Sequence, residues 1–268
     1  MKILSILLML SATVSFGSCS KTQDSATKPK TYVLVHGAFQ GPYAWKFVKA
    51  QLEAKGQRVV VIELPGHGSD MTNPATLSID AYRDEVVSVI NAIEGKVILV
   101  GHSMGGMVIT ATAEKIPLKI EKLVYIAAFV PATGQNIQDL ASTDATSILG
   151  PNLKPSPDQL TLDISKDKLA SIFCADGSAE VKQSLIDNYR AEPAIPFGSP
   201  VTVTAASYGS VDKYYIHTLQ DMAIGIDNQN KMAKAAGITA VYTLNSSHCP
   251  FLSKPDEVTS ILLEIGKK

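Results

Sequence analysis

Residues 97–106 have the sequence VILVGHSMGG, in which four apolar residues lead into a Gly-x-Ser-x-Gly motif. The apolar run predicts a buried strand, and the small and apolar residues 107–113 predict a helix directly after the motif. A serine on a sharp turn between a strand and a helix is typical of a nucleophile elbow, where the hydroxyl projects from the end of a sheet. The alternative is a glycine-rich turn with an incidental serine. We take Ser103 as the candidate nucleophile.

Strands and helices are predicted to alternate on the amino-terminal side of this stretch. Residues 31–35 and 58–62 are rich in apolar and β-branched residues and predict strands. Residues 43–54 and 79–93 have helical spacing, with Ser78 as a plausible N-cap of the second helix. Strands that alternate with helices of this length predict an α/β fold, with a mostly parallel sheet flanked by helices.

The alternation stops at Pro131 and resumes near residue 211. Residues 131–210, called the insertion below, are irregular and polar, with helical pieces near 165–173 and 179–188. We interpret the insertion as a helical cap over the strand ends; a second helical layer without a role in binding is the alternative. Outside it we expect strands at 123–127, 213–216 and 240–244, and helices at 228–236 and 256–265, the last capped by Ser253.

The N-terminus has the features of an export signal. Residues 1–18 combine a basic end, a short apolar core and small residues, which predicts a signal peptide. The sequence FGSC at 16–19 resembles a bacterial lipoprotein signal, in which Cys19 is lipidated after cleavage; plain secretion and an uncleaved anchor are the alternatives. Ser20 favours the outer membrane by analogy. Residues 19–29 would form a flexible tether, leaving a core of alternating strands and helices at 30–130 and 211–268.

Overall composition excludes some functions. The 268-residue chain is 46% hydrophobic and 18% charged, with a formal net charge of -1. Near-neutral charge without a basic stripe argues against a nucleic acid partner. We find no metal cluster, phosphate loop or dinucleotide fingerprint, so no cofactor or metal is expected. Cys174 and Cys249 fit no zinc pattern and are interpreted as unpaired thiols or as one disulfide.

A serine nucleophile needs a base to take its proton. The chain has five histidines. His36, His67 and His102 each lie in a turn that gives them a local structural reason, which leaves His217 and His248. His248 lies in SSHCP, after the last predicted strand and before the last helix, where a triad in the order Ser, acid, His has its base. His248 is therefore the candidate base and His217 the alternative.

The acid that orients the base is expected after the preceding strand. Asp221 lies just past the predicted strand at 213–216, and Asp227 lies further along the same loop. Asp212 precedes that strand and would lie at the wrong end of the sheet. Asp221 would hold the imidazole in the correct tautomer and stabilise the imidazolium, with Asp227 as the alternative.

The transition state also needs two backbone N–H donors and a binding pocket. One donor should come from Met104, the residue after the nucleophile, and the other from the loop after the first strand, at Ala38. Aromatic residues near the motif loops or in the insertion are candidates to line an apolar pocket above Ser103: Phe39, Phe129, Phe173 and Phe251.

Three segments together resemble a known family. The sequences VLVHGAFQGPYAW, VILVGHSMGG and SSHCPFLSKP resemble the α/β-hydrolases of the plant methylesterase and hydroxynitrile lyase group and their bacterial esterase relatives. The resemblance is close over residues 32–127 and from 214 to the end, and faint across the insertion. It implies the same triad and oxyanion donors, a small, often aromatic or methyl ester as substrate, no cofactor and a homodimer. The lipoprotein-like N-terminus departs from the plant members and suggests a periplasmic scavenging or detoxifying role.

Ester hydrolysis is the favoured hypothesis among three. A serine carboxylesterase fits the residues above; a lyase or cofactor-free perhydrolase of the same fold, and a binding lipoprotein with little turnover, are the alternatives. In the resembling lyases a Thr follows the first-strand His and a Lys follows the catalytic His. This chain has Gly37 and Cys249 at these positions. Because cyanide departs as an anion, a lyase calls for a fixed cation nearby, and these positions favour the esterase.

Overall fold

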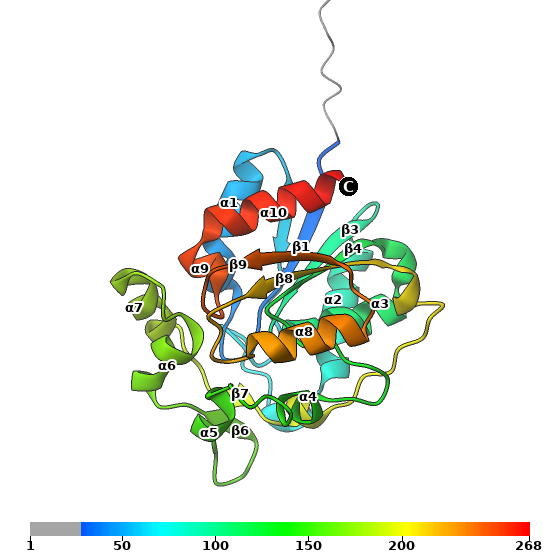
Figure 1. Ribbon diagram of the computed structural model, residues 1–268. Helices are drawn as coiled ribbons and strands as arrows, with labels where there is room; N and C mark the ends of the chain where they lie inside the picture. Colours follow the sequence, from blue (N-terminus) through cyan, green and yellow to red (C-terminus); the bar gives the residue numbers. More distant parts are fainter. Residues whose placement is uncertain (1–27) are drawn as a thin grey trace, which may run out of the picture.

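A six-stranded, wholly parallel sheet forms the centre of the protein (Figure 1). The structure is a computed structural model that describes residues 28–268, so the predicted signal peptide, Cys19 and most of the tether lie outside the described residues. The strand order is β2-β1-β3-β4-β8-β9. The strands are β1 (Thr31–Val35), β2 (Arg58–Val61), β3 (Val97–His102), β4 (Ile120–Ile126), β8 (Asp212–Thr218) and β9 (Ala240–Leu244). This architecture confirms the predicted α/β fold.

Helices cover both faces of the sheet (Figure 1). One face carries α1 (Lys46–Ala54), the short α9 (Pro250–Ser253) and α10 (Pro255–Lys267). The other carries α2 (Ile79–Asn91), α3 (Gly105–Lys115) and α8 (Ile226–Ala235). The inner strands β1 and β3 are buried along their whole length, which explains their unbroken apolar sequences.

Local sequence accounts for where the helices begin. Ser78 caps α2, because its hydroxyl accepts a hydrogen bond from the amide of Ala81 at 3.1 Å. The predicted cap of the last helix is wrong: Ser253 is the final residue of α9, and α10 begins at Pro255 without a side-chain cap. The proline cannot continue the hydrogen bonding of α9, and its fixed φ suits the first position of a new helix.

The insertion contains more β structure than the sequence indicates. Its helices are α4 (Ile137–Ala141), α5 (Leu149–Asn152), α6 (Lys166–Phe173) and α7 (Ala179–Asp187), and α6 and α7 match the two predicted helical pieces. Three very short strands form a second, antiparallel sheet in the order β5-β6-β7. They are β5 (Lys154–Pro155), β6 (Thr161–Asp163) and β7 (Glu192–Pro193). Strands of two or three residues are too short to give an alternating pattern, so this sheet could not be predicted.

The final part of the insertion returns to the core. Glu114 of α3 accepts hydrogen bonds from the amides of Thr204 and Tyr208 at 2.8 and 3.2 Å. This segment therefore packs along α3, while α4 to α7 lie beyond the carboxyl ends of the strands (Figure 1). Among the helices of residues 28–268, none has the length and apolar character needed to cross a bilayer.

Candidate active site

Ser103 occupies a strained turn between β3 and α3. Its φ is 53°, in the left-handed region that residues other than glycine rarely adopt. Gly101 and Gly105 make the turn possible: a Cβ on Gly101 would lie 2.6 Å from the carbonyl oxygen of Gly105, and a Cβ on Gly105 would lie 2.8 Å from that of His36. The backbones therefore approach at distances that no side chain would allow, as a nucleophile elbow requires.

The structure pairs His248 with Asp221. Asp221 Oδ2 accepts a hydrogen bond from His248 Nδ1 at 2.7 Å, and both side chains are buried. The carboxylate is held in turn by the hydroxyl of Thr218 at 2.8 Å and by the amides of Ala223 and Ile224, also at 2.8 Å. These bonds fix the tautomer of His248 with its proton on Nδ1, so that Nε2 can accept a proton.

The second ring nitrogen of His248, Nε2, forms no hydrogen bond within residues 28–268, and the atom is buried. The ring lies beside Phe173, with centroids 5.8 Å apart, and Phe173 lines the same cavity as Ser103. His102, which directly precedes Ser103, donates a hydrogen bond from Nε2 to the backbone oxygen of His248 at 3.0 Å. The candidate base is thus held at the same end of the sheet as the candidate nucleophile.

The alternative triad residues lie elsewhere. Asp227 is in the first turn of α8, whereas the carboxylate bonded to His248 is that of Asp221. His217 is in β8, with its ring 4.4 Å from that of Tyr215. Burial lowers the pKa of His217, so its imidazole is neutral near pH 7. The arrangement leaves His248 and Asp221 as the pair that can serve Ser103.

The two residues predicted as oxyanion donors line the same cavity as Ser103. Ala38 and Met104 both line the cavity, and neither amide donates a hydrogen bond within residues 28–268. Met104 is the N-cap of α3, where the partial positive charge of the helix is concentrated. Both positions predicted as oxyanion donors therefore lie together at the nucleophile, with their N–H groups unused.

The cavity above Ser103 has a volume of about 330 Å³. The core contributes Ala38, Met104, Phe129 and Ala223, and the insertion contributes apolar side chains that include Ile137, Leu149, Leu153, Phe173 and Phe197. Asp144 is the one ionisable residue among the described residues of the lining. Its carboxylate already accepts hydrogen bonds from the amides of Gly225 and Thr146, at 2.7 and 3.1 Å. The cavity is therefore suited to a neutral, mainly apolar molecule.

Only two of the four predicted pocket phenylalanines line this cavity. Phe129 and Phe173 do so. Phe39 packs instead between Phe173 and Tyr189, with ring centroids 5.8 and 6.0 Å away. Phe251 is fully buried against Trp45, at a centroid distance of 4.5 Å. Both are buried in the hydrophobic core, and neither is among the residues that line the cavity.

Comparison with known proteins identifies the family. The sequence matches the alpha/beta hydrolase family over residues 32–261. The chain belongs to this family. Methylesterase 7 of Arabidopsis thaliana is 30% identical over 254 residues, which cover 89% of this chain and 97% of the relative. A pyrethroid hydrolase of Sphingobium wenxiniae is 28% identical over 250 residues, covering 87% of this chain and 86% of the relative.

Solved structures of similar proteins have the same fold. A pyrethroid hydrolase from Sphingobium faniae superposes with a TM-score of 0.80 at 25% identity, covering 89% of this chain and 97% of the other. Polyneuridine aldehyde esterase has the same TM-score at 23% identity, with 89% and 100% coverage. These comparisons confirm the resemblance found in the sequence and support a hydrolase, because the relatives are esterases and hydrolases.

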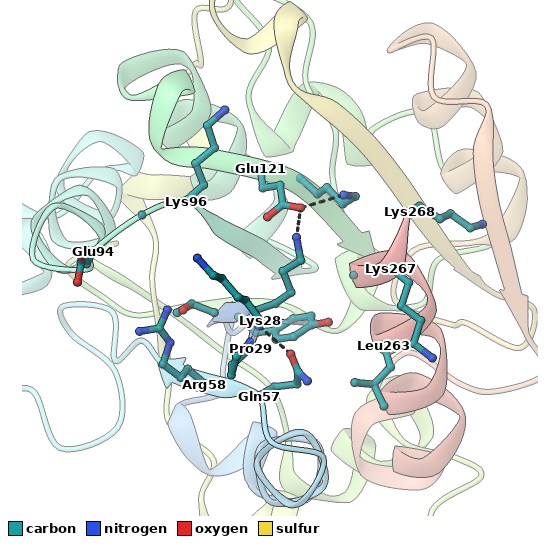
Figure 2. Close-up of a pocket in the computed structure, with 16 residues that line it drawn as sticks. Lys28, Pro29, Gln57, Arg58, Glu94, Lys96, Glu121, Leu263, Lys267 and Lys268 are labelled. Atoms are coloured by element: carbon teal, nitrogen blue, oxygen red, sulfur yellow. Dashed lines mark hydrogen bonds and ion pairs between the residues drawn. The ribbon is translucent and has the colours of Figure 1, made fainter. Parts of the chain in front are cut away.

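This alpha/beta hydrolase has a second, larger hollow at the opposite end of its sheet. It measures about 530 Å³, and its lining includes Lys28, Arg58, Lys96, Lys267 and Lys268 (Figure 2). Lys30, also in the lining, forms an ion pair with Glu121 at 2.6 Å. The lining holds no serine, histidine or cysteine, so the hollow offers no Ser-His or Cys-His pair. Within residues 28–268 no group of three or more His, Cys, Asp or Glu residues could hold a metal ion.

Some residues of the site could not be found from the sequence. The apolar residues Ile137, Leu149, Leu153 and Phe197 line the cavity from short helices of the insertion or from positions directly beside them. They follow no periodic pattern, and the family resemblance is faint there. Their one signal is that they are apolar residues in an otherwise polar stretch, which does not distinguish pocket from core.

Proposed function

We propose that this alpha/beta hydrolase is a serine carboxylesterase that acts on small, apolar or aromatic esters. One observation carries the proposal: the imidazole of His248 is fixed by Asp221 at 2.7 Å, its Nε2 has no hydrogen-bond partner within residues 28–268, and its ring lies beside Phe173, which lines the same cavity as Ser103. A buried base with one nitrogen held by a carboxylate and the other free is what activation of a serine hydroxyl requires.

Acylation would begin with transfer of the Ser103 hydroxyl proton to His248 Nε2. As the proton leaves, Oγ forms a bond to the ester carbonyl carbon, and the carbonyl π electrons move to the oxygen. The amides of Ala38 and Met104 donate hydrogen bonds to this oxyanion. When the carbonyl re-forms, the bond to the alkoxy oxygen breaks, and the imidazolium returns its proton to that oxygen. An alcohol departs and an acyl-enzyme remains.

Deacylation repeats these steps with water. His248 Nε2 takes a proton from a water molecule, the water oxygen attacks the acyl carbon, and the same two amides stabilise the second oxyanion. Collapse expels Ser103 Oγ, which recovers its proton from the imidazolium, and a carboxylic acid is released. Throughout, Asp221 stays ionised and stabilises the imidazolium.

The substrate class follows from the cavity. A volume of about 330 Å³ lined by Phe129, Phe173 and aliphatic side chains suits a small neutral ester and offers no cation for a carboxylate-bearing one. The relatives are named for methyl esters and pyrethroids, so both kinds of ester belong in a substrate panel.

The lyase alternative is disfavoured at two positions. A Cβ on Gly37 would lie 2.7 Å from His102 Nδ1 and 2.8 Å from Ser103 Cβ, so the threonine of the resembling lyases does not fit here. Burial holds the pKa of Cys249 well above its usual value, so this thiol is neutral and supplies no charge for departing cyanide. A binding protein with little turnover is distinguished by the experiment below.

We also propose that the protein is exported and held by a lipid on Cys19. Residues 1–19 supply the argument, as set out above. The described chain begins at the basic hollow, which Lys28 lines (Figure 2), while the candidate active site lies at the other end of the sheet. A tether on Cys19 would therefore leave the catalytic cavity directed away from the anchored end.

The test is a panel of p-nitrophenyl and aryl esters of increasing chain length, assayed with wild type and with Ser103→Ala, His248→Ala and the double variant. We expect each single variant to lose about 10⁴- to 10⁶-fold in kcat/KM and the double variant to lose no more, because the triad acts as a unit. Asp221→Asn should cost about 10⁴-fold, and Asp227→Asn should retain wild-type rates. Ester turnover that survives Ser103→Ala would contradict the proposal.

A further inference from the structure

Glu192 of β7 is a fully buried carboxylate that contacts the loop carrying Ala38. Its Oε2 accepts a hydrogen bond from the amide of Phe39 at 2.6 Å. The same carboxylate lies 2.9 and 3.1 Å from Nε2 of His67, and the exposed fractions of the His67 and Glu192 side chains are 2% and 0%. A buried charge is tolerated only when it is paired and hydrogen-bonded, and Glu192 meets both conditions with residues of the core.

The amide that Glu192 holds belongs to a strained residue. Phe39 has a φ of 62°, in the left-handed region that an L-residue with a bulky side chain avoids unless its surroundings impose it. The N–H of Phe39 is part of the peptide group that joins it to Ala38. An acceptor that fixes this N–H therefore also restrains the backbone of Ala38, which lines the cavity together with Ser103.

His67 is held in its charged form by its two partners. Its Nδ1 lies 3.1 Å from the carbonyl oxygen of Pro65, and its Nε2 lies against the Glu192 carboxylate. Both partners can only accept, so both ring nitrogens must carry protons. Burial, the largest single influence, lowers the pKa of His67, but the charge and hydrogen bond of Glu192, together with the hydrogen bond to the Pro65 carbonyl, outweigh it, and the net pKa is raised.

We infer that Glu192 is a positioning residue for ester hydrolysis: its carboxylate, held by His67, fixes the Phe39 amide and thereby sets the Ala38 amide toward the oxyanion. The inference rests on the proposed function. The insertion then has a part in the reaction beyond enclosing substrate, because β7 supplies the hydrogen-bond acceptor for the loop that carries Ala38 and Phe39, called the oxyanion loop below. Glu192 touches neither substrate nor nucleophile and acts through Phe39.

The test compares Glu192→Ala and Glu192→Gln with a matched control, Glu114→Gln. Glu114 also accepts hydrogen bonds from two backbone amides of the insertion, those of Thr204 and Tyr208. It lies on α3 and makes no hydrogen bond to the oxyanion loop. We measure kcat and KM for p-nitrophenyl acetate, the Ki of a trifluoromethyl ketone and the urea midpoint. Ser103 Oγ would add to the carbonyl carbon of the ketone. The resulting oxyanion would then accept hydrogen bonds from the amides of Ala38 and Met104.

We expect Glu192→Ala to lower kcat by about 10- to 100-fold, less than the roughly 10²–10³ lost when an oxyanion donor is deleted. KM should change by less than about threefold, because substrate binding in the ground state does not depend on this amide. The ketone Ki should rise in step with the fall in kcat/KM. Glu192→Gln, which keeps an oxygen acceptor for Phe39, should lie between alanine and wild type. Glu114→Gln should alter the urea midpoint alone.

The outcomes separate this inference from the proposed function. If hydrolysis persists in Ser103→Ala, the proposed function fails and the inference with it. If hydrolysis depends on Ser103 but both Glu192 variants keep the wild-type kcat and Ki, the inference alone is overturned. Should Glu192→Ala not fold, Glu192→Gln decides: reduced kcat with raised Ki supports positioning, and losses that match those of Glu114→Gln contradict it.

Discussion

His102 donates a hydrogen bond from Nε2 to the backbone carbonyl oxygen of His248 at 3.0 Å, and the two rings lie 4.5 Å apart. The bond joins the residue before the candidate nucleophile to the candidate base, although 146 positions separate them in the sequence. Burial, with a smaller contribution from His248, lowers the pKa of His102 well below its usual value. His102 is therefore neutral, and it does not oppose the positive charge that the proposed reaction would place on His248.

Replacement of His102 should therefore leave His248 in place but position it less well. His102→Phe keeps an aromatic ring but leaves the His248 carbonyl without its donor. We expect kcat to fall by about tenfold with KM little changed, and the free energy of unfolding to fall by roughly 1–3 kcal/mol, the cost of an unsatisfied buried acceptor. Steady-state kinetics and urea denaturation measure both quantities. A stable variant with wild-type kcat would show that the bond does not position the base.

Gly37 should prevent this chain from acquiring lyase chemistry. A Cβ at this position would approach His102 Nδ1 to 2.7 Å and Ser103 Cβ to 2.8 Å. We expect wild type to hydrolyse p-nitrophenyl acetate and to leave mandelonitrile intact. Gly37→Thr should lower ester turnover by more than about tenfold, because misplaced reacting groups cost rate steeply, and should release no cyanide. Cyanide release by wild type that depends on Ser103 and rivals ester turnover would overturn the assignment.

The sequence predicted those candidate site residues that a short motif or their order along the chain marks out. The Gly-x-Ser-x-Gly motif after an apolar strand located Ser103, and chain order placed Asp221 and His248 at the ends of neighbouring strands. Glu192 shows why the rest could not be predicted. It lies 153 positions from its partner Phe39 and 125 from His67, in a two-residue strand without periodicity. Its burial arises only when the insertion packs onto the core, and no short stretch of sequence encodes that contact.

Phe173 should determine the preferred ester length. It lines the cavity and lies beside His248. Phe173→Ala should shift the ratio of kcat/KM values toward longer p-nitrophenyl esters by about tenfold, a typical effect of added space in an apolar pocket. Phe251→Ala is the control, because Phe251 is buried but does not line the cavity. It should reduce stability by about 3–5 kcal/mol and leave the ester ratio unchanged. Identical ester profiles in Phe173→Ala and wild type would exclude a role in specificity.

Cys19 should decide whether the protein is bound to the membrane. Lipidation of this residue would partition the mature protein into the membrane fraction, and Cys19→Ser should release it or stall its processing. Cys174→Ser is a matched control, because Cys174 is a buried thiol of the folded domain; it should remain membrane-bound. Fractionation and mass spectrometry of the mature N-terminus measure these outcomes. An unmodified N-terminus downstream of Cys19 would rule out the anchor.

The pair of His67 and Glu192 should make the free energy of unfolding fall as the pH rises above neutrality. Four groups from three segments face His67: Glu192 raises its pKa, Arg190 lowers it, and the uncharged His36 and Tyr82 pack on its ring, with centroids 4.9 and 5.5 Å away. Burial and the charge of His67 lower the pKa of His36 to about 3, and burial raises that of Tyr82, so neither is charged near pH 7. The net shift of His67 is upward.

The sign follows from proton binding. Between the ordinary histidine pKa of about 6.5 and the raised folded value, the native state holds a proton that the unfolded state has released. The free energy of unfolding therefore falls as pH rises through this range. The contribution of the pair is complete below pH 6.5 and is lost above the folded pKa. His67→Gln, which can still donate to Glu192 but cannot titrate, should lack this component. Urea denaturation of both proteins from pH 5 to 9 measures the difference; equal slopes would show that His67 is neutral in the native state.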